Sequence, residues 1–242
     1  MELEGSVALV TGAGRGLGRA FAGELVRHGA AKVYGGARDT SSITERGVTP
    51  VELDITDPYA VSRAAASCGD VNLLINNAGI MLAGPPSSSS IADARSQMEV
   101  NYFGTLAMCQ AFAPVVAANG GGALVHMLSV LALITNPQSS GYAASKAAEW
   151  SITNALRVEL RSQGTQVVSV FSAYIDTDMA ATVDGPKVAP EEAARRTLEG
   201  IAAGEEEIFI DDISRFVKGS LGNDLEQIYP GIQQQYDTTA LR

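Results

Sequence analysis

A tyrosine and a lysine stand four positions apart in the segment 141–147, Gly-Tyr-Ala-Ala-Ser-Lys-Ala. Residues four apart on a helix face each other, so Tyr142 and Lys146 can interact. A phenol ionises near pH 10 and is a poor acid–base catalyst at neutral pH. A neighbouring ammonium, together with a cationic cofactor ring, can lower its pKa toward 7, a change of about three units or roughly 4 kcal/mol. The pair therefore predicts a site of proton transfer.

Size and composition indicate an ordinary enzyme-like domain. The chain has 242 residues, 46% hydrophobic and 18% charged, which is enough to bury a full core. A net charge of −10 argues against nucleic acid or an anionic membrane as the partner. Cys68 and Cys109 show no paired spacing and only two histidines accompany them, so we expect reduced thiols and no metal site. No basic leader or membrane-length apolar run is evident, which predicts a soluble, cytoplasmic protein.

Short apolar runs alternate with segments of helical periodicity along the chain. The predicted strands are 7–10, 32–35, 48–53, 72–75, 123–128, 166–171 and 207–210. The predicted helices are 16–27, 57–67, 90–118, 141–161 and 190–202. The link 40–46 is short, so we expect a turn there in place of a helix, and the serine-rich segment 85–90 reads as a loop that caps the next helix. This alternation predicts an α/β fold with a doubly wound parallel sheet of about seven strands, each buried.

A glycine-rich segment follows the first predicted strand and precedes a helix. Its spacing, Gly12-x-x-x-Gly16-x-Gly18, differs from the common dinucleotide fingerprint and lacks the lysine of a P-loop. Glycine permits close backbone approach, and a helix N-terminus offers free amides to an anion. The segment predicts a phosphate-binding loop, although a glycine turn used only for packing is the alternative.

The end of the second predicted strand indicates which dinucleotide is bound. An acidic residue there binds the ribose hydroxyl of NAD, whereas arginine accommodates the 2′-phosphate of NADP. This chain has Ala37 at that place, followed by Arg38, and Arg15 in the glycine loop is a second cation. Charge complementarity favours NADP(H). The alternative is that Arg38 is an ordinary surface charge and Asp39 contacts the ribose.

Together these residues resemble the short-chain dehydrogenase/reductase family over nearly the whole chain. The matching elements are the segment 11–18, Asp54, the sequence Asn76-Asn77-Ala78-Gly79, Asn101, Ser129 thirteen residues before Tyr142, and the Tyr142/Lys146 pair. The resemblance implies one Rossmann-type domain over 1–242, with a cofactor half (1–100), a catalytic and substrate half (101–212) and a C-terminal extension (213–242). It implies a carbonyl reductase or alcohol dehydrogenase in which Tyr142 donates the proton, Lys146 lowers its pKa and contacts the nicotinamide ribose, Ser129 binds the substrate oxygen, and Asn101 positions a water.

The same resemblance implies the residues that contact NADP(H). They are Gly12, Gly14, Arg15, Gly16, Leu17, Gly18, Arg38, Asp54, Ile55, Asn76, Asn77, Ala78, Gly79, Tyr142, Lys146, Ile175 and Thr177. Taken singly, Asn101 reads better as a helix cap and Ser129 as a strand end, and 76–79 can be read as a turn.

Several segments depart from the family pattern. Ser172-Ala173 replaces the usual Pro-Gly, so the backbone there is expected to take a different path. His126 reads as a core histidine. The segment 211–242 is long and polar, with an expected turn at 229–231. The helices 101–118 and 141–161 carry apolar residues beyond core needs, which predicts a homodimer or homotetramer.

Substrate choice is expected to lie in the loops. The predicted pocket wall is Met81, Leu131, Leu133, Ser139, Tyr174 and Met179. These residues are mostly apolar and include no base, which favours a neutral, apolar ketone or secondary alcohol. Two alternatives stay open: a lyase or dehalogenase on the same fold, and a regulatory protein that senses NADP(H) without turnover.

Overall fold

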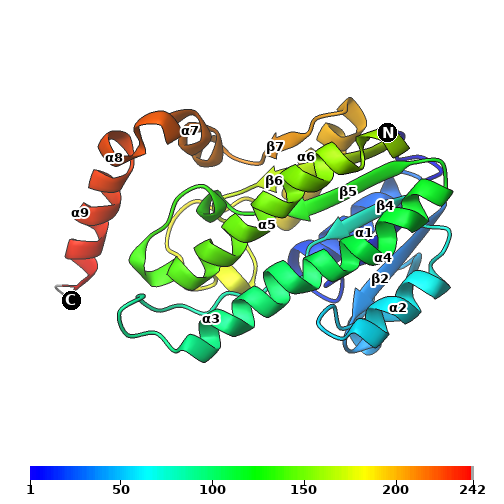
Figure 1. Ribbon diagram of the computed structural model, residues 1–242, viewed down its shortest axis with the longest axis horizontal. Helices are drawn as coiled ribbons and strands as arrows, with labels where there is room; N and C mark the ends of the chain where they lie inside the picture. Colours follow the sequence, from blue (N-terminus) through cyan, green and yellow to red (C-terminus); the bar gives the residue numbers. More distant parts are fainter. Residues whose placement is uncertain (241–242) are drawn as a thin grey trace.

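The computed structural model describes residues 1–240, and one parallel sheet runs through it (Figure 1). Its seven strands lie in the order β3-β2-β1-β4-β5-β6-β7. The strands are β1 Val7–Thr11, β2 Lys32–Ala37, β3 Val48–Glu52, β4 Leu73–Asn76, β5 Gly122–Met127, β6 Thr165–Phe171 and β7 Glu207–Phe209. All pairs are parallel, as the alternation of strands and helices predicted.

Helices cover both faces of this sheet. The main helices are α1 Gly16–Arg27, α2 Pro58–Ser67, α3 Ile91–Met98, α4 Thr105–Ala118, α5 Ser140–Glu159 and α6 Pro190–Ala203. Helices α1 and α6 pack on one face in a core that includes Val10 and Leu198, and α2 and α4 pack on the other with Leu9 and Phe112. Side chains on successive positions of β1 therefore serve opposite layers, as the alternation of a strand requires.

Local signals in the sequence explain where several helices begin. The Asp57 carboxylate accepts a hydrogen bond from Tyr59 N before α2, and the Ser90 hydroxyl accepts one from Ala92 N before α3. These side chains satisfy amides that the first helical turn leaves unpaired. The predicted 40–46 connection holds only a single 3-10 turn, Thr40–Ser42, capped by Asp39.

The long helix predicted over 90–118 is interrupted. Residues Glu99–Gly104 form a π-helical turn between α3 and α4. By length and composition alone, the stretch Ile91–Ala118 could cross a membrane, with a mean hydropathy of 1.3 in its most apolar window. In the fold it belongs to the helical layer, where α4 packs on β4, β5 and α2.

Strand β3 corrects one expectation. It was predicted as a buried strand, but it is the edge of the sheet and Thr49 and Pro50 are exposed. Proline has no N–H to donate, so it is tolerated at an edge.

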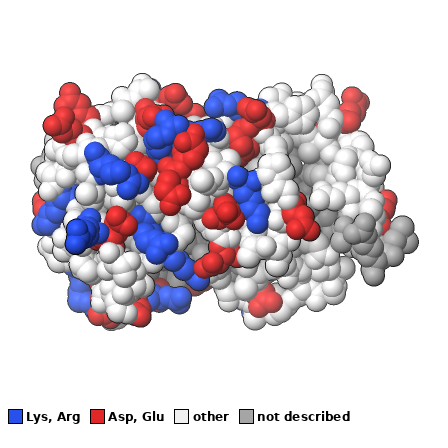
Figure 2. Space-filling view, turned by 180° about the vertical axis from the view of Figure 1, so that it is seen from behind, with Lys and Arg blue, Asp and Glu red and all other residues white. Residues whose placement is uncertain are grey.

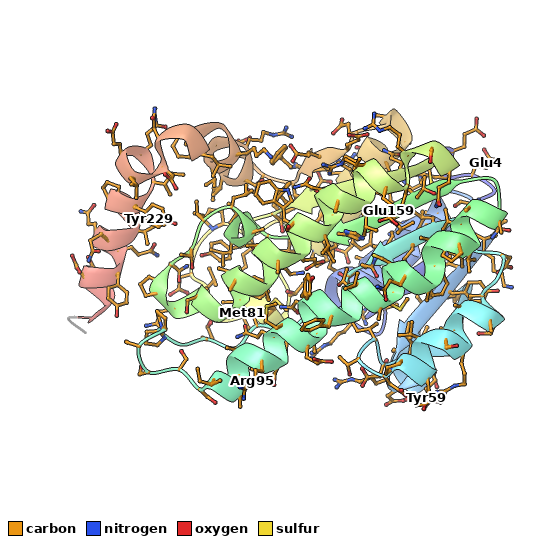
Figure 3. All side chains as sticks on the ribbon, in the orientation of Figure 1. Glu4, Tyr59, Met81, Arg95, Glu159 and Tyr229 are labelled. Atoms are coloured by element: carbon orange, nitrogen blue, oxygen red, sulfur yellow. The ribbon has the colours of Figure 1, made fainter. Side chains whose placement is uncertain are left out.

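The C-terminal region is helical, which corrects a second expectation. Helices α7 Asp212–Ser220, α8 Asp224–Gln227 and α9 Tyr229–Ala240 follow β7. The turn predicted at 229–231 is wrong, because these residues open α9, and Pro230 stands in its first turn, where proline costs no hydrogen bond. These helices lie at one end of the molecule (Figure 1), where Tyr229 is found, whereas Glu4 lies at the other end (Figure 3).

Candidate active site

The strand order reverses between β1 and β4. Strands β2 and β3 follow outward from β1, and β5, β6 and β7 follow outward from β4 on the other side. Ligands of open α/β sheets bind at the carboxyl ends of the strands beside such a switch point. A cavity of about 1040 Å³ lies there. Its walls come from the ends of the central strands, from the loop after β6 and from α9. The position and size suit a cofactor together with a small substrate.

The glycine loop is shaped to receive an anion. Gly12 and Gly16 have φ values of +68° and +50°, which favour glycine. A Cβ on Gly18 would stand 2.1 Å from the Gly12 carbonyl oxygen, so only glycine allows α1 to approach this closely. Helix α1 begins after Arg15 without a side-chain cap or an acidic residue in its first turn. Its free amides therefore point toward the cavity end of the helix, as anion binding requires.

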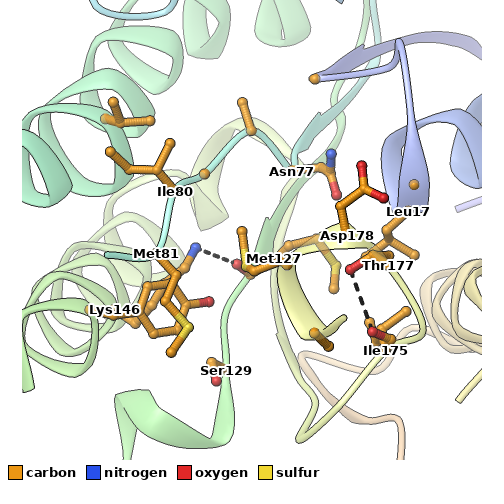
Figure 4. Close-up of a pocket in the computed structure, with 18 of the residues that line it drawn as sticks. Leu17, Asn77, Ile80, Met81, Met127, Ser129, Lys146, Ile175, Thr177 and Asp178 are labelled. Carbon is orange, nitrogen blue, oxygen red and sulfur yellow. Dashed lines mark hydrogen bonds between the residues drawn. The ribbon is translucent and has the colours of Figure 1, made fainter. Parts of the chain in front are cut away.

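Thr11 ties this loop to the segment after β4. Its hydroxyl oxygen accepts hydrogen bonds from the backbone N–H groups of Asn77 and Ala78 at 2.9 and 3.0 Å. The Asn77 amide donates in return to the Thr11 carbonyl at 2.9 Å. Thr177, on the loop after β6, comes so close that its Cγ2 would stand 3.2 Å from a Cβ at Gly16. Three separate segments thus meet around one end of the cavity (Figure 4).

Most predicted site residues do line this cavity. From the cofactor set these are Gly12, Gly14, Arg15, Gly16, Leu17, Gly18, Arg38, Asp54, Ile55, Asn77, Ala78, Gly79, Ile175 and Thr177. Ser129, Tyr142 and Lys146 join them, as do Met81, Leu131, Ser139, Tyr174 and Met179 from the predicted substrate wall.

Three predicted residues lie elsewhere. Leu133 packs among the apolar side chains around Phe171 and Val217 and is not part of the cavity wall. The Asn76 amide points into the core and donates to Cys109 Sγ at 3.6 Å. Asn101 is also fully buried behind the wall. Asn76 ends β4, and the alternation of side-chain directions along a strand turns it away from the cavity that its neighbour Asn77 lines. Asn101 lies in the π-helical turn Glu99–Gly104, and Leu133 follows a 3-10 turn, so their side chains take other directions.

Tyr142 and Ser129 converge from α5 and from the end of β5. Burial raises the pKa of the Tyr142 phenol, the Lys146 charge lowers it, the Glu149 charge raises it, and a hydrogen bond with Ser129 lowers it. Lys146 therefore lowers the pKa of the phenol as predicted, but burial, which is the largest effect, and the Glu149 charge keep the net pKa above the ordinary value. The predicted shift toward 7 also requires a cationic cofactor ring beside the phenol.

Lys146 lines the cavity, and its ammonium group is held by two buried acceptors. Its Nζ donates to the Met127 carbonyl at 2.7 Å (Figure 4) and to Glu149 Oε2 at 2.6 Å. The same Nζ lies 6.0 Å from the centre of the Tyr142 ring. Only 4% of the residue is exposed. The predicted Tyr–Lys proximity is therefore real, and the lysine has a charged partner that the sequence did not reveal.

Asn101 stands inside the π-helical turn and is not a helix cap. Its Oδ1 accepts from Ile80 N at 2.9 Å, and its Nδ2 donates to Ile80 O at 2.9 Å and to Ser145 Oγ at 2.8 Å. The side chain therefore clamps the segment after β4 onto α5, beside Lys146. Irregular turns of this type are frequent at functional sites.

Charges mark the far end of the cavity. Arg38 lines it, and its charge contributes to the lowered pKa of Asp54, which is set first by hydrogen bonds from Thr56. Arg15 pairs with Asp178 at 3.2 Å, and both side chains are more than 80% exposed. Asp39 uses its Oδ1 to accept from Ser41 N. That carboxylate thus already serves a local turn, which weakens the alternative that it binds a ribose.

The backbone at Ser172-Ala173 is held by hydrogen bonds to two neighbouring segments. The Ala173 N–H donates to Asp211 Oδ2 at 2.7 Å, and the Ser172 carbonyl accepts from Val130 N at 2.8 Å. No non-glycine residue among 1–240 has a positive φ, so alanine is unstrained here. Asp211 also caps α7, and it therefore couples this wall of the cavity to the C-terminal helices.

Other wall residues were missed by the sequence analysis. Ile232 and Tyr236 reach the cavity from α9, and Pro137, Thr182 and Val183 complete the apolar side. The approach of Ile232 and Tyr236 depends on how α7 to α9 fold back toward the sheet, and the local sequence pattern does not indicate this. Glu149 was also missed, although its place three residues after Lys146 puts it on the same helix face. Within the part of the chain whose side chains are described, no group of three His, Cys, Asp or Glu could hold a metal ion.

A doubly wound parallel sheet with this glycine loop, and with Ser, Tyr and Lys gathered in one cavity, defines a Rossmann-fold oxidoreductase. A family model described as short chain dehydrogenase matches residues 6–187. The 1-deoxy-11-beta-hydroxypentalenate dehydrogenase of Streptomyces exfoliatus is 31% identical over 239 residues, covering 93% of this chain and 82% of that protein.

Solved structures agree with this match. A short chain dehydrogenase from Burkholderia cenocepacia in complex with NADP is 39% identical, with a TM-score of 0.91, over 96% of this chain and 99% of that one. A short chain dehydrogenase/reductase from Burkholderia phymatum in complex with NAD is 25% identical, with a TM-score of 0.85, over 96% of each chain. The chain belongs to the short-chain dehydrogenase/reductase family and is an oxidoreductase.

Proposed function

We propose that this protein is an NADP(H)-dependent carbonyl reductase that also oxidises the corresponding secondary alcohol. The observation that carries the proposal is the convergence of Ser129, Tyr142 and Lys146 on the cavity that the glycine loop and Arg38 also line. A protein that only senses a dinucleotide needs no proton donor, and a lyase or dehalogenase needs no phosphate-binding loop. The geometry thus favours the redox reaction over both alternatives.

The residues present fit a dinucleotide. The uncapped N-terminus of α1 and the glycines at 12 and 16 would hold the pyrophosphate. Asp54 and Ile55 would bind the adenine, the backbone of 77–79 would pass beside the ribose, and Thr177 would meet the carboxamide. When bound, the nicotinamide supplies or accepts the hydride.

The protein's own part is to position the substrate and move a proton. Ser129 donates a hydrogen bond to the substrate oxygen and stabilises the negative charge that develops there. Tyr142 gives its phenolic proton to that oxygen in reduction and takes it back in oxidation. Because its pKa is raised, the phenol is protonated at neutral pH, which suits the reductive direction. Oxidation needs the phenolate and is therefore expected to gain rate as the pH rises.

The preference for NADP(H) is proposed from charge. Ala37 leaves no carboxylate at the end of β2, while Arg38 and Arg15 face the cavity. The NADP-bound relative is consistent with this preference, whereas the NAD-bound one is less similar.

Changing Arg38→Ser should lower kcat/KM for NADPH about ten- to a hundredfold and leave NADH nearly unaffected. A hydrogen bond to a charged group contributes about 1.5–3 kcal/mol, and only NADPH carries the 2′-phosphate. Initial rates with each cofactor measure the ratio. Asp39→Asn is the matched control and should leave the ratio unchanged, because that carboxylate is used by Ser41. A changed ratio in Asp39→Asn alone would transfer the assignment to Asp39.

The substrate is proposed to be a neutral, apolar ketone or secondary alcohol. Met81, Leu131, Tyr174 and Met179 form the wall, together with Ile232 from α9. Charged side chains crowd the face that Figure 2 shows and become sparse toward the end that carries the C-terminal helices. A panel of ketones of graded size, with and without a carboxylate, tests this: NADPH consumption should be fastest with large neutral members. A preference for the carboxylates would contradict it.

We also propose a homodimer or homotetramer built on α4 and α5, in a reducing cytoplasm. Phe103 and Val158 are exposed apolar residues beside or on these helices, and both cysteines are free thiols. Such faces suit a two-fold contact between copies.

A further inference from the structure

Helix α5 presents a buried polar stripe to the sheet. Tyr142, Lys146, Glu149 and Thr153 follow each other at spacings of four, three and four, so they lie on one helix face. All four are buried, and Glu149 is 1% exposed. The proposed reaction uses only the first two. Burying a carboxylate costs free energy unless the charge is paired, so the position of Glu149 requires an explanation.

Glu149 pairs directly with the lysine of the site. Its Oε2 accepts from Lys146 Nζ at 2.6 Å, and the side chains are 1% and 5% exposed. The second acceptor for the same Nζ is the Met127 carbonyl, which carries no net charge. Glu149 is therefore the group that compensates the buried ammonium.

The next turn of α5 is anchored by a chain of neutral hydrogen bonds. Thr153 Oγ1 donates to the Glu149 carbonyl at 2.7 Å. Because this bond uses the only proton of the hydroxyl group, Thr153 Oγ1 must accept in its other bond, from His126 Nδ1 at 2.6 Å. His126 Nε2 then accepts from Cys109 Sγ at 3.2 Å. This arrangement needs neutral His126, and burial lowers its pKa to about 3. The network restrains the backbone at Glu149 without adding a second charge.

We propose that Glu149 is a positioning residue whose carboxylate keeps the Lys146 side chain protonated and holds its ammonium beside the Tyr142 phenol. The role in turnover rests on the proposed function, whereas the effect on Lys146 can be measured without it. The groups that face the pair are Tyr142 on the same helix, His126 from β5 and Cys109 from α4, with Arg157 farther along α5. None of them carries a negative charge at neutral pH.

The charges support this role. Burial has the largest single effect and lowers the pKa of Lys146, but the Glu149 charge, the interaction with Tyr142 and the hydrogen bond to Glu149 together outweigh it, so the net pKa is raised. The pKa of Glu149 is itself raised to about 7, by burial that the lysine only partly offsets. Replacing the carboxylate by a neutral amide leaves the ammonium buried and unpaired, and such lysines lose their protons at much lower pH.

The test is to titrate Lys146 directly in Glu149→Gln. The chain has four lysines, so labelling the lysine ε-carbon with ¹³C gives few NMR signals, and Lys146→Arg identifies the relevant one. In the unchanged protein, the Lys146 signal should stay at its protonated position beyond the ordinary lysine pKa. In Glu149→Gln the midpoint should fall by at least about one unit. An unchanged midpoint would overturn the proposal.

Two further variants separate charge from structure. Glu207→Gln removes the partner of Lys218 on the surface and should leave the Lys146 titration unchanged. Glu149→Asp retains the charge on a shorter side chain, and its midpoint should lie between those of Glu149→Gln and the unchanged protein. If Glu149→Gln does not fold, the titration of Lys146 in the unchanged protein tests the proposal. A Lys146 midpoint below the ordinary lysine pKa refutes it.

The pH profile of ketone reduction gives a second readout. In Glu149→Gln the alkaline limb of kcat should move to lower pH over the range in which Lys146 stays protonated, because the Tyr142 phenol loses the Glu149 charge that raises its pKa. A purely structural role would lower kcat without moving the limb. Should no ketone be reduced, the proposed function fails while the NMR titration still tests Glu149.

Discussion

Changing Tyr142→Phe should lower kcat for ketone reduction about a hundredfold to ten-thousandfold and leave NADPH affinity almost unchanged. General acid catalysis by a positioned side chain contributes a factor of this size. Phenylalanine keeps the ring that fills the space between α5 and the cavity, and it removes only the hydroxyl. Steady-state rates with a reducible ketone, combined with a fluorescence titration of NADPH, measure the two quantities separately.

A matched control is available on the surface. Tyr59 lies on α2 at the edge of the molecule (Figure 3), is 79% exposed and is not part of the cavity lining. Changing Tyr59→Phe removes the same hydroxyl group and should leave kcat and NADPH affinity unchanged. Full activity in Tyr142→Phe would exclude the phenol as the proton donor.

Changing Gly18→Ala should abolish measurable NADPH binding or weaken it by more than about a hundredfold. The new Cβ would stand 2.1 Å from Gly12 O and 2.6 Å from Asn77 Nδ2, so the glycine loop or α1 must shift. Overpacking of this kind costs about 1–3 kcal/mol, and about 1.4 kcal/mol corresponds to a factor of ten. Displacement of the anion-binding amides adds to that loss. Isothermal calorimetry measures the binding, and thermal unfolding reports any loss of stability.

Gly219→Ala is the corresponding control. Gly219 lies in α7, and a Cβ there would meet nothing within 4 Å. Alanine loses less conformational freedom than glycine in a helix, so this variant should be neutral or slightly stabilised. Unaltered NADPH affinity in Gly18→Ala would mean that the glycine loop does not form the phosphate site.

The fold could be predicted because its signals are local. Apolar runs bounded by glycine mark each strand, and α1 occupies its predicted range 16–27. Asp57 and Ser90 mark helix starts by capping. Most of the other boundaries differ by one or two residues, where the chain frays between helix and turn. The burial of β3 was misjudged, because the pattern of one strand does not show its place in the order of the sheet.

The site was predicted where the required residues are close in sequence or follow strand ends. Tyr142 and Lys146 share one helix, and Ser129 follows β5. The charge state of the site could not be derived in this way. It depends on Glu149 being buried against Lys146 and on a sheet that keeps water out, and both are products of packing.

The C-terminal wall shows the same limit more clearly. Ile232 and Tyr236 meet the cavity only because α9 folds back, and Asp211 accepts the Ala173 N–H where the family usually has Pro-Gly. These contacts join segments separated by tens of residues. Leu133 failed as a pocket residue for the related reason that adjacent positions in a turn point in different directions.

Following the hydrogen that is transferred from the cofactor to the substrate tests the proposed redox reaction most directly. NADPH carrying deuterium at both hydrogen positions of the reactive carbon of its nicotinamide ring is incubated with the protein and a ketone that it reduces, and the alcohol is analysed by mass spectrometry. One deuterium should appear on the carbinol carbon for each NADPH consumed, and its appearance should slow in Tyr142→Phe. An alcohol without deuterium, or a protein that binds no NADPH, would contradict a hydride-transfer site in this cavity.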